Sequence, residues 1–131
     1  EAWRALHGDE APSVHLQHFV TAEFSIDESW NEVMKVRDEA LKALEEFKET
    51  GLENPLDAGL TLPAKLDKFD ACDLADLCGV SRATCEGEKV VVHDLREEPR
   101  CDRSWKRDGT VKLRSDGGML SDRDARAVGV E

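Results

Sequence analysis

The sequence predicts an α+β protein in which one long helix is followed by a small β-α-β-β unit and an irregular C-terminal segment. Apolar residues recur every three or four positions between residues 26 and 50, which is the pattern of an amphipathic helix. Residues 56–99 then alternate between strand-like and helix-like stretches. Beyond Pro99 the periodicity fades and glycines appear, which predicts loops. The 131 residues suffice for one ordinary domain or two small subdomains.

Residues 1–25 are predicted to form the end of a helix and a connector. Residues 1–7 have the character of last helical turns, and Gly8 is a natural stop after them. Residues 13–20 mix apolar and polar side chains without a helical stripe, so we expect an extended segment. The chain has no initiator Met and no signal-type start, so we expect a piece of a larger protein.

The long helix is predicted to begin at Ser25 or Asp27 and to stop at Gly51. Acidic residues near its start complement the positive end of the helix dipole. A glycine after the last periodic residue favours termination there. The stripe that we expect to face a core consists of Trp30, Val33, Val36 or Arg37, Ala40, Leu41, Leu44 and Phe47.

Residues 56–99 are predicted to form a small α/β subdomain. Alternating apolar residues and a β-branched run predict strands, and helical spacing separates the first strand from the second. The expected elements are a strand over 56–62, a helix over 65–79 and strands over 80–85 and 88–95, with a tight turn at Glu86-Gly87.

The charge of the chain is distributed unevenly. The net charge is −11, and the excess of acids lies entirely in residues 1–99. Residues 100–131 hold eight bases against six acids, and the bases concentrate in residues 100–114. Such a stretch on an acidic body indicates either local contact with a polyanion or a solvated loop. There is no run of 18 apolar residues, so no membrane span is predicted.

The cysteines and histidines do not form a recognisable catalytic motif. The four cysteines contain no C-x-x-C pair, so reduced thiols in the cytoplasm are expected. Cys72, Cys78 and Cys85 are predicted to be buried small hydrophobes. Cys85 and His93 could meet across the predicted hairpin, but no third group orients them. We therefore predict that this chain is not itself an enzyme.

Four positions in the C-terminal segment follow the spacing of a zinc site. A four-cysteine site has two C-x-x-C pairs separated by 15–20 residues. Here the corresponding positions are Cys101, Ser104, Ser121 and Asp124. One thiol and one carboxylate cannot close a tetrahedral structural site, and serine is not among the usual zinc ligands. The predicted metal content is therefore none, with zinc absent.

Several stretches resemble the C-terminal region of bacterial-type isoleucyl-tRNA synthetases, in that family's order. Residues 1–16 are similar to its Glu-(Ile/Ala)-Trp helix and Ser-Val-x-Leu, and residues 30–45 to its W-x5-VR…AL-E helix. Residues 56–62 resemble its S-L-E-A-x-V-x-L strand. Residues 101–106 resemble C-x-R-C-W-K, and residues 120–124 resemble L-C-x-R-C, although three of the four cysteines are replaced here.

The resemblance implies a division of the chain into four parts. These are the end of a helical anticodon-binding bundle (1–25), a long amphipathic helix (26–55), a small α/β subdomain (56–99) and a zinc-finger-like module without its ligands (100–131). It implies a non-catalytic region that holds the anticodon end of isoleucine tRNA. The parent would be a cytoplasmic class I isoleucine–tRNA ligase that uses ATP and magnesium. The implied partners are that tRNA and the rest of the synthetase, with no membrane and no DNA.

The residues that we expect to contact tRNA are Arg100, Arg103, Trp105, Lys106, Arg107 and Arg37. The basic side chains would meet phosphates. Trp105 would either stack on an unpaired base or belong to the core of the module. Arg37 would either face RNA or pair with a neighbouring acid. The alternative function is an acidic docking or structural module, of the synthetase or of a partner protein, in which helix 26–50 docks and no RNA is contacted.

Overall fold

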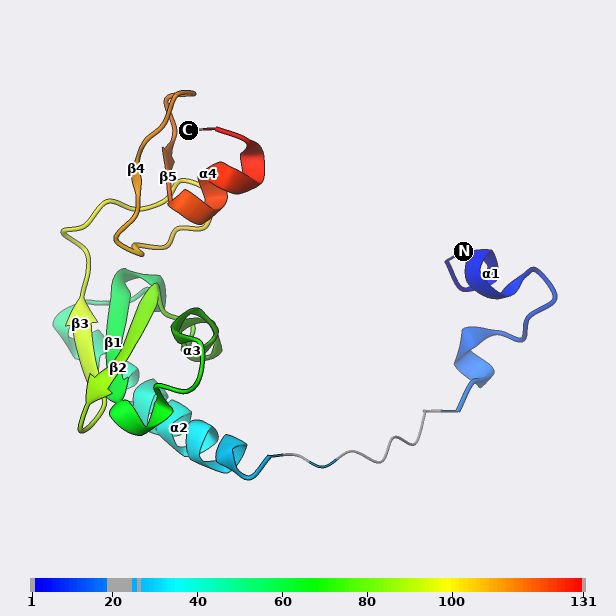
Figure 1. The fold of residues 1–131 in the computed structure, drawn as a ribbon, viewed down its shortest axis with the longest axis horizontal. Helices are drawn as coiled ribbons and strands as arrows, with labels where there is room; N and C mark the ends of the chain where they lie inside the picture. Colours follow the sequence, from blue (N-terminus) through cyan, green and yellow to red (C-terminus); the bar gives the residue numbers. More distant parts are fainter. Residues whose placement is uncertain (1, 19–24, 26, 131) are drawn as a thin grey trace.

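The computed structural model describes residues 2–18, 25 and 27–130, and it confirms the α+β class. Figure 1 shows the elements in chain order. The helices are α1 (Ala2–His7), α2 (Ser29–Phe47), α3 (Ala71–Cys78) and α4 (Asp122–Val128). The strands are β1 (Ala58–Pro63), β2 (Arg82–Gly87), β3 (Val91–Asp94), β4 (Lys112–Leu113) and β5 (Met119–Leu120). None of the described helices is both long and apolar enough to cross a membrane.

The N-terminal segment is a short helix followed by a turn. The predicted helix over 1–7 is confirmed for residues 2–7, which form α1, and Gly8 ends it in a left-handed conformation with φ of 87°. Residue 1 lies outside the described residues. The prediction of an extended segment over 13–20 is wrong for Val14–Leu16, which form a 3-10 turn. The Ser13 hydroxyl caps this turn by accepting a hydrogen bond from the amide of His15. Residues 19 and 20 lie outside the described residues.

The predicted long helix is confirmed as α2, with a 3-10 turn after it and Gly51 left-handed at its end. Its predicted start at Ser25 or Asp27 is wrong, because the helix begins at Ser29. Asp27 accepts a hydrogen bond from the amide of Ser29 at 2.9 Å, which satisfies one unpaired donor of the first turn. The predicted core stripe is narrower than expected, because Trp30 and Leu41 are 46% and 38% exposed. The side chains of α2 that are buried are Val33, Val36, Ala40 and Leu44.

The main sheet has the strand order β2-β1-β3, with β1 parallel to β2 and antiparallel to β3. The predicted hairpin between the second and third strands is therefore wrong, because β1 lies between them. β1 is the central strand, buried along almost its whole length and paired on both edges. The predicted tight turn at Glu86-Gly87 is also wrong, since β2 continues through Gly87.

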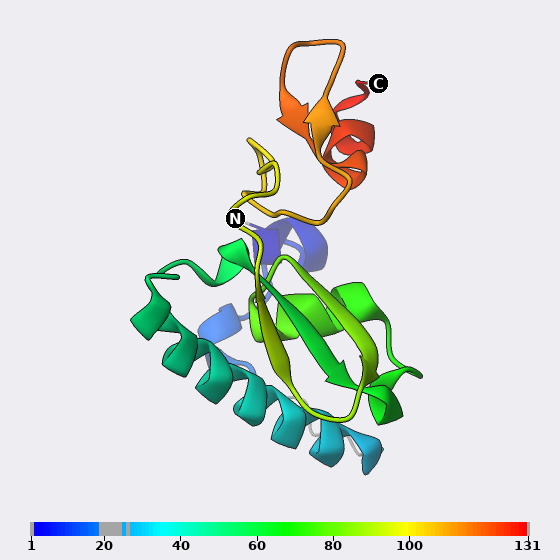
Figure 2. The same cartoon turned by 90° about the vertical axis from the view of Figure 1, so that its left-hand side faces the viewer.

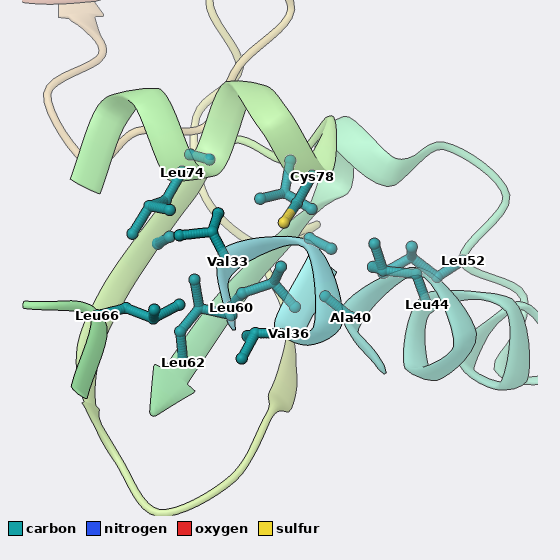
Figure 3. Close-up of a cluster of buried hydrophobic side chains, with 14 residues drawn as sticks. Val33, Val36, Ala40, Leu44, Leu52, Leu60, Leu62, Leu66, Leu74 and Cys78 are labelled. Atoms are coloured by element: carbon teal, nitrogen blue, oxygen red, sulfur yellow. The ribbon is translucent and has the colours of Figure 1, made fainter. Parts of the chain in front are cut away.

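Helices α2 and α3 supply the apolar layer that covers the sheet (Figures 1 and 2). Their side chains meet those of β1 in one buried cluster, which includes Val33, Val36, Ala40, Leu44, Leu60, Leu62, Leu66, Leu74 and Cys78 (Figure 3). Helix α3 is shorter than the predicted helix over 65–79. It begins at Ala71 because the Asp70 carboxylate accepts hydrogen bonds from the amides of Cys72 and Asp73.

The C-terminal segment is more regular than predicted. Strands β4 and β5 pair antiparallel, and α4 follows β5 directly. The module has a small core of its own, formed by Cys101, Leu120 and Ala125 with Val111 and Val130 packed against it. The expectation of loop structure beyond Pro99 is therefore wrong for these elements. The helix is short, but it has a capped start at Ser121 and a left-handed glycine at its end, Gly129.

Candidate nucleic-acid interface

The basic loop, residues 100–107, is a tight turn closed by its own backbone. The amide of Cys101 donates to the carbonyl of Lys106 at 2.9 Å, and the amide of Trp105 donates to the carbonyl of Cys101 at 2.9 Å. Closing the turn places Trp105 at φ of 63°, and among the described residues no other non-glycine has a positive φ. This conformation costs a bulky residue about 1–2 kcal/mol. The surrounding hydrogen bonds therefore hold the tryptophan in an unfavourable backbone state.

Trp105 lies outside the core of the module. Its side chain is 53% exposed, so the expectation that it is a core residue is wrong. The guanidinium of Arg100 lies over the indole, 5.0 Å from the ring centroid, which is cation–π geometry. Arg100 is itself exposed. The loop thus presents an aromatic face and a delocalised cation together to solvent.

The four positions that follow zinc spacing do come together, as a polar cluster of Cys101, Ser104, Ser121 and Asp124. The Cys101 thiol donates to Oδ2 of Asp124 at 3.2 Å, and the Ser121 hydroxyl donates to the same oxygen at 2.9 Å. The amide of Ser121 donates to Sγ of Cys101 at 3.5 Å, and the amide of Asp124 donates to Ser121 Oγ at 3.1 Å. Cys101 and Ser121 are almost fully buried. One carboxylate is therefore the centre of a hydrogen-bonded cluster.

The surroundings of Asp124 favour its ionised form. The nearby Ser104 hydroxyl lowers the pKa of this carboxyl most, and the donors Cys101 and Ser121 lower it further, against the opposing effect of burial. The Ser104 hydroxyl is buried and makes no hydrogen bond itself, although it lies close to the Asp124 carboxylate. Arg103 adds an ion pair, with Nε 3.6 Å from Oδ1 of Asp124.

The donor set of the polar cluster does not fit structural zinc. Zinc binds thiolate, imidazole and carboxylate groups, and the cluster offers one thiol, one carboxylate and two hydroxyls. The thiol here donates a hydrogen to Asp124, whereas a zinc ligand must be deprotonated. No group of three His, Cys, Asp or Glu side chains within residues 2–18, 25 and 27–130 is arranged to hold a metal ion. The absence of zinc stays a prediction.

Lys106 and Arg107 connect the basic loop to the α/β unit. Lys106 forms an ion pair with Asp76 of α3. Arg107 Nε donates to Asp57 at 2.7 Å, its Nη1 donates to the carbonyl of Glu98, and its amide donates to the Ser81 hydroxyl at 2.7 Å. Only 14% of the Arg107 side chain is exposed. The side chains of Lys106 and Arg107 are therefore occupied by contacts that fix the C-terminal module on the α/β unit.

Two further basic side chains also make internal contacts. Arg37 Nε donates to the carbonyl of Leu77 at 3.2 Å and its Nη1 lies 3.7 Å from Asp38, so this side chain joins α2 to α3. Arg114 is buried and donates twice to the carbonyl of Leu120 and once to Asp122. Its guanidinium lowers the pKa of Asp122. Of the predicted contact residues, Arg100, Arg103 and Trp105 remain exposed to solvent.

The unpredicted helix α4 carries two exposed bases that sequence reasoning missed, Arg123 and Arg126. The helix start was detectable, because Ser121 is a favoured N-cap and two aspartates occupy the first turn. Arg123 also lines a cleft of about 410 Å³ between α3 and the module. That cleft carries both signs of charge, which gives it no clear preference for an anion.

The thiols outside the module do not form a catalytic pair. Cys78 is buried as predicted and Cys85 is half-buried, but Cys72 is exposed, so its predicted burial is wrong. Burial raises the pKa of the Cys85 thiol, which leaves little reactive thiolate at neutral pH. His93 is engaged elsewhere, with Nε2 2.8 Å from the Thr61 hydroxyl. Since β1 separates β2 from β3, the two residues do not meet across a hairpin.

The chain is similar to two curated isoleucine–tRNA ligases. It is 30% identical to isoleucine–tRNA ligase 1 of Oceanobacillus iheyensis over 149 aligned positions, which cover 98% of this chain and 16% of that protein. It is 32% identical to the isoleucine–tRNA ligase of Petrotoga mobilis over 119 positions, which cover 79% of this chain and 13% of that protein. The chain thus spans about a sixth or less of either relative. No protein-family model matches it.

Proposed function

We propose that this chain is a tRNA-contacting region of an isoleucine–tRNA ligase and carries no catalytic site itself. The parent protein would be a cytoplasmic, ATP- and magnesium-dependent ligase, with isoleucine tRNA and the remainder of the synthetase as partners. The similarity to two isoleucine–tRNA ligases over most of the chain supports this assignment. The anticodon end of the tRNA is the part that the resemblance of the C-terminal motifs implies.

The exposed Arg100–Trp105 pair is the observation that carries the proposal. Single-stranded RNA is bound largely by stacking of bases on aromatic rings and guanidinium planes. An indole that is half exposed and overlaid by a guanidinium offers such a surface. The strained backbone of Trp105 fits this role, since unfavourable conformations concentrate at functional sites.

The remaining basic residues have different tasks in this proposal. Arg103 is half exposed and only weakly held by Asp124, so it is free to approach a phosphate. Lys106 and Arg107 would act chiefly by fixing the loop on the α/β unit, with RNA contact secondary. Arg37 would likewise have a structural role, because its side chain joins α2 to α3.

A charge-reversal experiment tests the proposal. The double variant Arg100→Glu, Arg103→Glu is titrated with isoleucine tRNA over a series of salt concentrations, beside the unaltered chain. Each phosphate contact adds about 0.7–0.9 to the slope of log affinity against log salt. Losing two contacts should therefore weaken binding and flatten the slope by about 1.4–1.8.

The matched control reverses two charges elsewhere. Lys35→Glu with Lys42→Glu changes the net charge equally but lies on exposed positions of α2. We expect its slope to stay within about 0.5 of the unaltered chain, because only close contacts release counterions. Equal slopes in both double variants would show that net charge alone governs binding and would contradict the assigned interface.

A further inference from the structure

A second surface, on the side of α2 that faces α3, is apolar without being buried. Trp30, Met34 and Leu41 are 46%, 43% and 38% exposed, and they recur at helical spacing along α2. The ring of Trp30 lies 5.7 Å from that of Phe69, at 48°. Exposed large apolar side chains that line up on one face indicate an interaction site.

Beside this stripe the surface is hollowed into an apolar groove. A pocket of about 350 Å³ is lined by Trp30 of α2, Phe69, and Leu74 and Leu77 of α3. Met34 follows Trp30 by one helical turn, which places it beside the pocket on the same side of α2. We call this surface, with Leu41 at its far end, the α2–α3 groove.

The edges of the α2–α3 groove are acidic. Asp73 and Asp76 of α3 line the pocket, together with Asp70, the N-cap residue of that helix. On α2, Asp38 and Glu45 stand one turn after Met34 and Leu41, and their side chains are 76% and 72% exposed.

The basic residues near the groove offset this charge only in part. They are Lys68 over the Phe69 ring, Arg37 bonded to Leu77 and 3.7 Å from Asp38, Lys106 paired with Asp76, and Lys48 paired with Glu45. Five carboxylates therefore face four bases, and three of those bases already have protein partners.

We propose that the α2–α3 groove binds a basic amphipathic helix of a partner protein, with large apolar side chains inserted beside Trp30 and lysines or arginines on its flanks. An apolar groove takes a helix through anchors spaced three or four residues apart. The acidic edges select positively charged flanks and disfavour RNA. They also disfavour a second copy of this chain, which would bring the same carboxylates together. The groove does not involve Arg100, Arg103 or Trp105, so this proposal stands apart from the tRNA proposal.

The test uses the 131-residue chain and a synthetic helical peptide of about 16 residues with leucines on one face and lysines on both flanks. Binding is followed by amide and indole NMR shifts. The structure predicts that shifts concentrate at Trp30, Met34 and Phe69. Two control peptides keep the length: one scatters the leucines around the helix, and the other replaces lysine by glutamate. Both are expected to bind about tenfold more weakly or worse.

Matched variants locate the binding surface. Met34→Lys places a charge beside the pocket on the Trp30 side of α2, whereas Asn31→Lys makes the same charge change at another exposed position of α2. We expect Met34→Lys to weaken binding by about tenfold or more, and Asn31→Lys by less than about twofold. Leu41→Lys serves as a second variant at the far end of the groove. Circular dichroism checks that each variant keeps its helix content.

Several outcomes would overturn the proposal. The first is no binding of the leucine–lysine peptide at about 1 mM, and the second is equal weakening by Met34→Lys and Asn31→Lys. Sedimentation that shows a dimer, lost in Met34→Lys, would assign the groove to a second copy. If isoleucine tRNA shifts the same resonances as the peptide, the α2–α3 groove would be assigned to RNA binding. None of these results bears on charge reversal at Arg100 and Arg103, so the two proposals fail separately.

Discussion

Replacing Asp124 by alanine tests whether one carboxylate holds the C-terminal module together. Asp124 is 8% exposed, and its Oδ2 accepts hydrogen bonds from the Cys101 thiol and the Ser121 hydroxyl. In Asp124→Ala both donors stay buried and lose their acceptor. A buried donor without a partner costs about 1–3 kcal/mol, and a thiol is the weaker donor of the two. We therefore expect a loss of about 2–4 kcal/mol in the free energy of unfolding of the module.

The assay is denaturant unfolding with amide hydrogen exchange as a local probe. The amides of Ser121 and Arg114 report on the module, and the amides of β1 report on the α/β unit. Because the two regions have separate apolar clusters, we expect the loss to fall mainly on the module. Asp116→Ala is the control within the module, since Asp116 accepts one exposed hydrogen bond from Gly118. Its expected cost is about 1 kcal/mol or less.

The pH dependence of Asp124→Ala follows from the lowered pKa of this carboxyl. Its folded pKa lies below the unfolded value of about 3.9, so its contribution is complete above that pH and is lost as the pH falls through the folded pKa. The stability difference between the unaltered chain and Asp124→Ala should be constant near neutrality and shrink below about pH 4. A cost no larger than that of Asp116→Ala, or a difference that grows on acidification, would refute the central role of Asp124.

Three further predictions concern the same module. The triple variant Ser104→Cys, Ser121→Cys, Asp124→Cys should bind one zinc ion per chain, because the four positions already lie close together. A chelator should then lower the melting temperature of this variant. Absence of zinc in the variant, measured by mass spectrometry, would contradict the zinc-site spacing. Trp105→Gly should change the free energy of unfolding by no more than about 1 kcal/mol, since glycine adopts a positive φ without strain. The same variant should bind tRNA about 5- to 100-fold more weakly. A large loss of stability would instead assign Trp105 a structural role. Arg107→Ala should destabilise the chain by about 2–3 kcal/mol in thermal unfolding, because Asp57 loses a mostly buried partner; an effect on tRNA affinity without loss of stability would show direct RNA contact.

Local sequence signals predicted the helices best. The stripe of α2 and its glycine stop are readable because helical periodicity depends on neighbours along the chain. The strand order of the sheet could not be predicted from the sequence. It depends on β1 being buried enough to pair on both edges, which separates β2 from β3. The first turn of α3 was misplaced because Leu66 and Phe69 continue the helical spacing ahead of the Asp70 cap.

The sequence predicted where the candidate site lies, but it predicted only part of what each residue in the site does. Spacing alone identified Cys101, Ser104, Ser121 and Asp124, and these residues do cluster. Charge alone could not separate exposed bases from internal ones, because the acids that hold Arg107 and Lys106 are 50 and 30 residues away in the sequence. The sequence left open whether Trp105 is exposed or buried, and no sequence rule predicts a positive φ for tryptophan.

Titration with isoleucine tRNA tests whether this chain contacts that tRNA through its basic loop. The same tRNA with an exchanged anticodon is measured in parallel, both over a salt series. We predict salt-sensitive binding that weakens on anticodon exchange and is lost when Trp105 and Arg100 are replaced by alanine. Absence of binding at low salt, where even a few phosphate contacts should be measurable, would contradict it.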